Sequence, residues 1–207
     1  MQCLRNRAFI AQNTNDPQAA LEYAQQAQAR LKQSPIAKPD VEAELLADIA
    51  AAQYLAGRND AAERYYADAL AKFIAMGRGE SPSIFFLRNN WGIASFASGD
   101  PRRALEQYDE ALRIAVQRSI GGEPPPYLLI NRATALVALT RYDDALAAYG
   151  TAIESATRAG NAGVRIAGVA GRANTRLLMG DVDGAERELA PLTPEIGATG
   201  RRTACLQ

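Results

Sequence analysis

Two adjacent asparagines, Asn89 and Asn90, stand in the stretch LRNNWGIASFASGDPRRALEQYDEALRIA, which reads as two helices separated by a Ser-Gly-Asp-Pro turn. Asparagine is a mediocre helix former, because its side chain competes for backbone hydrogen bonds. Its amide offers donors and an acceptor, so it can pair with the N–H and C=O groups of an extended peptide, whatever side chains that peptide carries. The pair is therefore a candidate for recognition of a peptide backbone. The alternative is a solvated helix face on which asparagine is tolerated.

Side chains suited to catalysis or metal binding are scarce. The chain contains no histidine, which removes the commonest general base and the commonest zinc ligand. Cys3 and Cys205 lie near opposite ends without metal-ligand spacing, and we interpret them as free thiols. Glu42, Glu44 and Asp48 stand close together in the sequence. Acids at the start of a helix usually complement the helix dipole. The alternative is that these acids make one end of a binding groove acidic. The sequence predicts a protein that is not an enzyme, with no cofactor and no metal site.

Charge and hydropathy limit the classes of partner. The 207 residues include 23 Lys and Arg and 23 Asp and Glu, so no charge excess favours nucleic acid or an anionic membrane. No apolar run approaches the length of about 18 residues that a membrane span needs, and the start MQCLRNRAFI lacks the apolar core of a signal peptide. We expect a soluble, cytoplasmic chain with no nucleic-acid and no membrane partner.

Helix stop and start signals recur at a nearly constant interval. Tight turns rich in Gly, Asn, Asp and Pro alternate with longer loops, which is typical of stacked helical hairpins. An alanine follows each tight turn at the same distance, and successive alanines are 40 to 42 residues apart. These anchor alanines are Ala20, Ala62, Ala104, Ala145 and Ala185. Twelve residues before each anchor stands another small residue, which lets two helix backbones approach: Ala8, Ala50, Gly92, Ala133 and Ala173.

Three anchors carry a family resemblance. Ala62-x3-Tyr66, Ala104-x3-Tyr108 and Ala145-x3-Tyr149 resemble the second half of the tetratricopeptide repeat (TPR). The chain departs from that pattern in a period longer than the usual length of about 34 residues, in the missing proline near the repeat's end, and in arginines at three aliphatic positions. These arginines are Arg7, Arg132 and Arg172. The long period resembles the variant of kinesin light chains and of helical sensor regions in large bacterial regulators.

The resemblance implies an all-α fold, a TPR-type right-handed superhelix or solenoid of about five helical hairpins. We predict a single domain over residues 1–192, with repeats at about 1–33, 40–76, 82–118, 127–158 and 163–190. Residues 193–207 are predicted to form an irregular C-terminal tail, without the polar helix that caps many solenoids. We therefore expect a part of a larger protein, such as a bacterial regulatory or signalling protein, or ends that dock on a partner.

A helical wheel places one stripe of residues on the groove side of the TPR stack. With the small residue of each first helix at 0° and a step of about 100° per residue, the stripe covers about 100° to 160°. Its members are Asn6, Phe9, Asn13, Glu44, Asp48, Ala51, Leu55, Phe86, Asn90, Ile93, Ala97, Tyr127, Asn131, Thr134, Ala138, Ala167, Gly171, Asn174 and Leu178. Asn6, Asn90 and Asn131 occupy the same offset in three repeats.

Aromatic residues accompany the asparagines on this stripe and would anchor apolar side chains of a ligand. Asn89-Asn90 before Trp91-Gly92 resembles the Leu-Asn-Asn-Leu-Ala element with which kinesin light chains hold peptide backbones, although Trp91 departs from it. We predict a peptide-binding site made of Asn90, Asn131, Phe86, Tyr127, Asn89, Asn6 and Asn174.

Five arginines of the later first helices fall on the opposite side of the wheel. We expect Arg88, Arg132, Arg165, Arg172 and Arg176 to form structural ion pairs with acids of the second helices, such as Glu106, Asp109, Glu110, Glu154 and Glu186. The stripe itself holds no lysine or arginine, so binding of chaperone tails through a carboxylate clamp is not expected.

The function predicted from these patterns is a non-enzymatic scaffold that binds an extended segment of another protein in its concave groove. The alternative is a structural module that forms a homo-oligomer through its uncapped ends. An enzymatic role would need a catalytic domain outside this chain.

Overall fold

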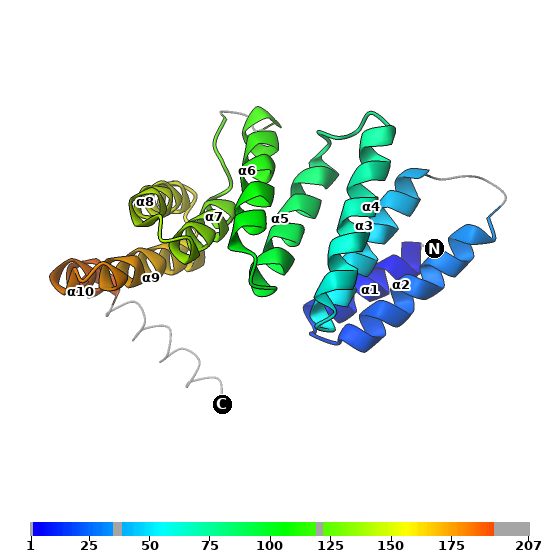
Figure 1. Ribbon diagram of the computed structural model, residues 1–207, viewed down its shortest axis with the longest axis horizontal. Coiled ribbons are helices and arrows are strands. Elements are labelled where there is room, and N and C mark those ends of the chain that lie inside the picture. The colour runs from blue at the N-terminus through cyan, green and yellow to red at the C-terminus, as the bar shows by residue number, and fades with distance from the viewer. Residues whose placement is uncertain (1, 35–38, 119–121, 193–207) are drawn as a thin grey trace. The chain divides into compact units, whose positions relative to one another are not determined.

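The computed structural model describes residues 2–34, 39–118 and 122–192 (Figure 1). Within these ranges the chain forms ten α-helices, one 3-10 turn and no strand. The helices are α1 (Gln2–Asn13), α2 (Pro17–Lys32), α3 (Pro39–Leu55), α4 (Asn59–Ala75), α5 (Pro82–Ala97), α6 (Pro101–Arg118), α7 (Pro126–Ala138), α8 (Tyr142–Arg158), α9 (Ala162–Leu178) and α10 (Val182–Leu189), followed by η1 (Ala190–Leu192). The predicted tail and Cys205 lie outside the described residues, and Cys3 is exposed.

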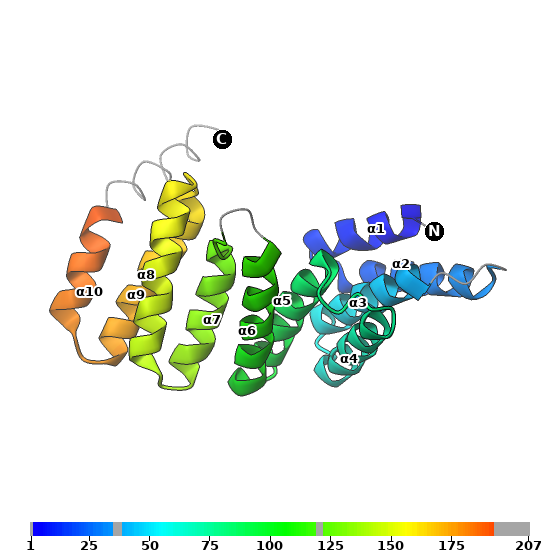
Figure 2. The same cartoon turned by 90° about the horizontal axis from the view of Figure 1, so that it is seen from above.

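Consecutive helices pair into five hairpins whose ends lie within one residue of the predicted repeats. The hairpins fall into two compact units. The first unit runs to Gly122 and contains α1 to α6, in which the first helices pack on one another as α1 with α3 and α3 with α5. The second unit begins at Glu123 and contains α7 to α10, which run side by side in Figure 2. The all-α hairpin fold predicted from the sequence is confirmed, and the single domain over 1–192 stays a prediction.

Each hairpin turns through the same backbone motif. Two residues after the first helix ends, a residue adopts positive φ, and the N–H of the residue that follows it donates to the carbonyl five residues earlier, as in a Schellman motif. The residues with positive φ are Asn15, Gly57, Gly99, Thr140 and Gly180. The tight turns expected from the sequence are therefore helix caps that reverse the chain.

Small residues set how closely the helices approach. The five anchor alanines are all buried, with at most 1% of their surface exposed. A Cβ added to Gly92 of α5 would lie 2.5 Å from Cε1 of Tyr108 on α6, so no larger residue fits there without movement. In the second unit, a Cβ added to Gly171 of α9 would lie equally close to Tyr149, which is on α8 of the preceding hairpin. Large side chains from a neighbouring helix thus fill the space that the small residues leave.

Thr140 offers a test of the turn motif. A β-branched residue is strained at its φ of 57°, whereas glycine adopts this conformation freely. We expect Thr140→Gly to raise the free energy of unfolding by about 1 kcal/mol, measured by urea denaturation.

Thr151→Gly is the matched control, because Thr151 is an exposed residue inside α8. Glycine there should lower the free energy of unfolding by a similar amount. A loss of stability in Thr140→Gly would show that the turn conformation is not the source of strain.

Candidate binding groove of the first unit

The first helices of the first unit line a hollow of about 400 Å³. Its walls come from α1, α3 and α5, and its floor includes the buried side chains of Tyr66 and Phe73 on α4. The lining residues are Arg5, Phe9, Gln12, Glu44, Ala47, Asp48, Ala51, Tyr66, Phe73, Ser83, Phe86, Leu87 and Asn90. A smaller hollow of about 150 Å³ shares Ala51, Tyr66 and Asn90 with it and adds Tyr54, Leu55 and Ile93. We call the two hollows together the first-unit groove.

Helical spacing explains why these side chains share one surface. On α3, Glu44, Asp48 and Ala51 stand at i, i+4 and i+7, and on α5, Phe86 and Asn90 have the same four-residue spacing. Because α3 packs between α1 and α5, the stripes of the three helices become continuous. The structure thus brings together six residues of the predicted stripe around the larger hollow: Phe9, Glu44, Asp48, Ala51, Phe86 and Asn90.

Large aromatic rings are exposed around this hollow. Phe9 on α1 has 64% of its surface exposed, and Phe86 on α5 has 57%. The ring of Phe85 lies 4.6 Å from that of Phe86, centroid to centroid, and supports it from one side. Exposed phenylalanines around a hollow are unusual on a solvated surface and favour an apolar contact with a ligand.

An arginine sits between two carboxylates at the same hollow. Arg5 Nη1 donates to Glu44 Oε2 over 2.5 Å, and Arg5 Nε donates to Asp48 Oδ2 over 2.7 Å. Burial removes water from the Asp48 carboxylate and raises its pKa, although the hydrogen bond from Arg5 opposes this effect. Gln12 Nε2 donates to the backbone oxygen of Asp48 and joins α1 to α3 at the same level.

Arg5 corrects one expectation from the sequence. The groove was expected to hold no lysine or arginine, yet Arg5 lines it. The wheel describes the direction of each Cα–Cβ bond, whereas the long arginine side chain reaches across to the next helix. Glu44 and Asp48 consequently serve as partners of Arg5. The third acid of this stretch, Glu42, pairs with Lys72 of α4 at 3.1 Å.

The two central asparagines have different surroundings. Asn90 is exposed and lines both hollows, while Asn89 is buried with 7% of its surface exposed. Asn89 Nδ2 donates to Asn90 Oδ1 over 3.1 Å, so Asn89 orients the side chain that reaches the groove. Asn89 is therefore placed as a support for Asn90 and not on the groove surface.

The other predicted site residues are not among those that line these hollows. Asn6 is exposed on α1 and accepts a hydrogen bond from Gln2 Nε2. Tyr127 and Asn131 are on α7 of the second unit, and Asn174 is exposed on α9. Tyr127 is partly exposed, and its partial burial raises the pKa of its phenol. Their part in binding stays a prediction.

Arg172 and Arg176 form the expected type of ion pair, but with other acids than those suggested by the sequence. Arg172 of α9 pairs with Glu188 of α10 at 2.5 Å, and Arg176 pairs with both Glu188 and Asp181. Glu186, which the sequence suggested as a partner, is exposed. Arg88 Nη1 instead donates to the neutral Gln107 Oε1 over 2.8 Å, and burial lowers the pKa of Arg88.

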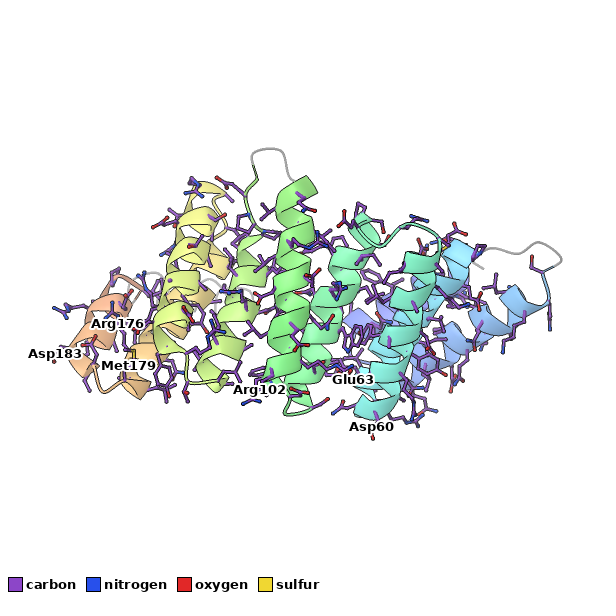
Figure 3. All side chains as sticks on the ribbon, turned by 45° about the horizontal axis from the view of Figure 1, so that its top comes forward. Asp60, Glu63, Arg102, Arg176, Met179 and Asp183 are labelled. Atoms are coloured by element: carbon purple, nitrogen blue, oxygen red, sulfur yellow. The ribbon has the colours of Figure 1, made fainter. Side chains whose placement is uncertain are left out.

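Sequence reasoning missed the acid that holds α5 in place. Glu63 of α4, which is labelled in Figure 3, accepts hydrogen bonds from Trp91 Nε1 at 2.6 Å and from Ser95 Oγ at 2.5 Å. Arg103 of α6 pairs with the same carboxylate at 3.2 Å and lies over the Trp91 ring at 5.3 Å. The residue in the sequence that could have indicated this contact is Trp91, because a buried indole N–H needs a hydrogen-bond acceptor. Glu63 thus links α4, α5 and α6 beneath the groove.

Comparison with known proteins identifies the fold. No family model matches the chain, and no curated relative matches it. Solved structures do match the chain. One is a putative kinesin light chain from Podosopora anserina with nearly identical TPR-like repeats. Its TM-score is 0.81 and its sequence identity 18%, and the match covers 97% of this chain and 96% of that one. The fold is that of the TPR-like repeat proteins.

Two further TPR-like structures resemble the chain. BtubC (BKLC) from P. vanneervenii has a TM-score of 0.75 and 20% identity, over 92% of this chain and 80% of that one. A Rap protein complexed with Competence and Sporulation Factor has a TM-score of 0.72 and 15% identity, over 91% of this chain and 51% of that one.

The described residues contain neither a candidate membrane span nor a cluster of metal ligands. None of the helices in the described ranges combines the length and apolarity needed to cross a bilayer. No group of three or more Cys, Asp and Glu side chains in the same ranges is placed to hold a metal ion.

The Glu63 network generates a stability prediction. Glu63→Gln keeps the shape of the side chain but removes the charge that three donors share, so we expect the free energy of unfolding to fall by about 2 kcal/mol. Urea denaturation followed by the fluorescence of Trp91, the single tryptophan, measures it.

Asp68→Asn is the matched control, since Asp68 is an exposed acid on the same helix. It should change stability by less than about 0.5 kcal/mol. Equal effects of the two substitutions would show that the Glu63 network adds no stability.

Proposed function

We propose that the chain is a non-enzymatic scaffold and that its first-unit groove binds an extended segment of another protein. The observation that carries the proposal is that the exposed amide of Asn90 lines two adjoining hollows. The larger hollow is flanked by the exposed rings of Phe9 and Phe86, and the smaller one is more apolar. The amide can pair with the backbone of the segment, and the rings and hollows can receive its side chains. The Rap structure shows a TPR-like protein that is complexed with a named factor, which supports binding of this general kind.

The geometry suits an extended chain because successive side chains of such a chain point to opposite sides. A residue over the larger hollow can bury part of Phe9 and Phe86, and each large apolar side chain fully buried contributes about 1.5 to 3 kcal/mol. Asn90 between the hollows would then hold the intervening peptide group. The setting predicted from the sequence, a cytoplasmic signalling protein, remains part of this proposal.

Asn90→Ala is the direct test. Peptides selected on the wild-type chain from a random-peptide display library should bind the variant at least tenfold more weakly, because two backbone hydrogen bonds are worth about 1 to 3 kcal/mol. Isothermal titration measures the affinities, and the thermal midpoint should stay unchanged because Asn90 is exposed.

Gln25→Ala, an exposed amide on α2 outside the groove, is the matched control and should bind as the wild type does. Selected peptides that bind both variants equally would refute groove recognition by Asn90.

An exposed apolar cluster supports the second candidate function, self-association. Leu177, Leu178, Met179 and Val182 are exposed around the turn between α9 and α10, where Figure 3 labels Met179. If this cluster joins two copies, the mass measured by sedimentation should rise with concentration. Leu178→Lys with Met179→Lys should then give a constant monomer mass, and a constant mass for the wild type would exclude this candidate.

A further inference from the structure

We propose that the first-unit groove selects segments that carry an arginine or lysine next to a large apolar residue. This inference rests on the proposed function of the groove and adds the chemistry of its ligand. Three features of the same surface lead to it: an unbalanced carboxylate pair, exposed aromatic faces and an adjoining apolar hollow.

The charges that line the larger hollow do not balance. Arg5 is the single cation in the lining, and it faces the two carboxylates of Glu44 and Asp48. Counted by formal charge, one arginine and two carboxylates leave one net negative charge. Both carboxylates remain partly exposed, with 33% and 28% of their side chains accessible, so a second cation can approach them from the groove.

Arg5 also prepares these carboxylates for a ligand. It contacts one oxygen of each, which fixes both side chains before any segment binds and lowers the entropic cost of binding. Burial already disfavours the charged form of Asp48, so a nearby positive group stabilises it. An acidic side chain at the same place would meet two carboxylates and be repelled.

The aromatic residues favour the same ligand charge independently. Phe9 and Phe86 line the hollow that holds the carboxylates, and more than half of the surface of each is exposed. A guanidinium or ammonium group is attracted to the face of such a ring, and its aliphatic stem can pack against the other. A cationic side chain is therefore satisfied by carboxylates at its tip and by rings along its length.

The smaller hollow accounts for the apolar neighbour. Apart from the shared Asn90, its lining is apolar or aromatic: Ala51, Tyr54, Leu55, Tyr66 and Ile93. No charged side chain lines it among the described residues. Because Asn90 belongs to both hollows, a segment held there places one side chain over each, a cation on one side and an apolar group on the other.

The test begins with a random-peptide display library selected on the wild-type chain. We expect the selected peptides to be enriched in Arg or Lys beside Leu, Ile, Met or an aromatic residue. Synthetic peptides with that arginine replaced by citrulline, which has the same shape without the charge, should bind about tenfold more weakly, a loss of about 1.4 kcal/mol. This comparison uses the unaltered protein, so its outcome does not depend on the folding of a variant.

Glu44→Gln should reduce the difference between arginine and citrulline peptides to less than threefold. Glu22→Gln, an exposed acid on α2 outside the groove, should leave the difference at about tenfold. Circular dichroism of both variants establishes that the helices are retained.

The outcomes separate the two proposals. Peptides that depend on Asn90 but show no preference for arginine over citrulline would overturn the charge selectivity and leave groove binding intact. Enrichment of Asp or Glu in the selected peptides would overturn it as well. Failure to select any peptide that depends on Asn90 would overturn both.

Discussion

The close approach of two helices within each hairpin is the constraint on which the rest of the structure depends. Ala62, Ala104 and Ala145 are completely buried, and Gly92 leaves room for no more than the ring of Tyr108. Small side chains give little apolar area, so the partner helix must supply it through large residues such as Tyr66 and Tyr108. This division between small and large positions fixes the spacing of the helices, and that spacing decides which first helices meet on the groove side.

Polar contacts then determine how the groove helices are held. Glu63 ties α5 to α4 through Trp91 and Ser95, and Arg5 ties α1 to α3 through Glu44 and Asp48. In the first set the donors Trp91 and Ser95 are buried and the Glu63 side chain is partly exposed, and the set acts as a structural link. The second lies at the surface of the hollow, where the same charges that join two helices remain accessible to a ligand. The same ion pairs can therefore stabilise the packing of α1 on α3 and favour ligands of one charge.

The groove of the first unit combines side chains from three hairpins that are about 40 residues apart in sequence. Phe9, Asp48 and Asn90 each come from a different first helix, and none of them forms a site alone. Because consecutive first helices pack in the same way, residues at equivalent offsets meet on one face. This is why a stripe drawn on a helical wheel anticipated six residues of the larger hollow, although it described each helix separately.

The sequence by itself determined the hairpins and their faces, because periodicity, turn residues and small positions are local properties of the chain. It located the five turns, the buried alanines and the exposed side of Asn90. Only the tertiary structure decided that Asn89 is buried, that Arg5 reaches into the groove, and that Glu63 and Glu188 are the acids that bind Trp91 and Arg172. The physical reason is that a wheel describes the direction in which a side chain leaves its own helix. The length of that side chain and its partners on neighbouring helices depend on how the helices pack.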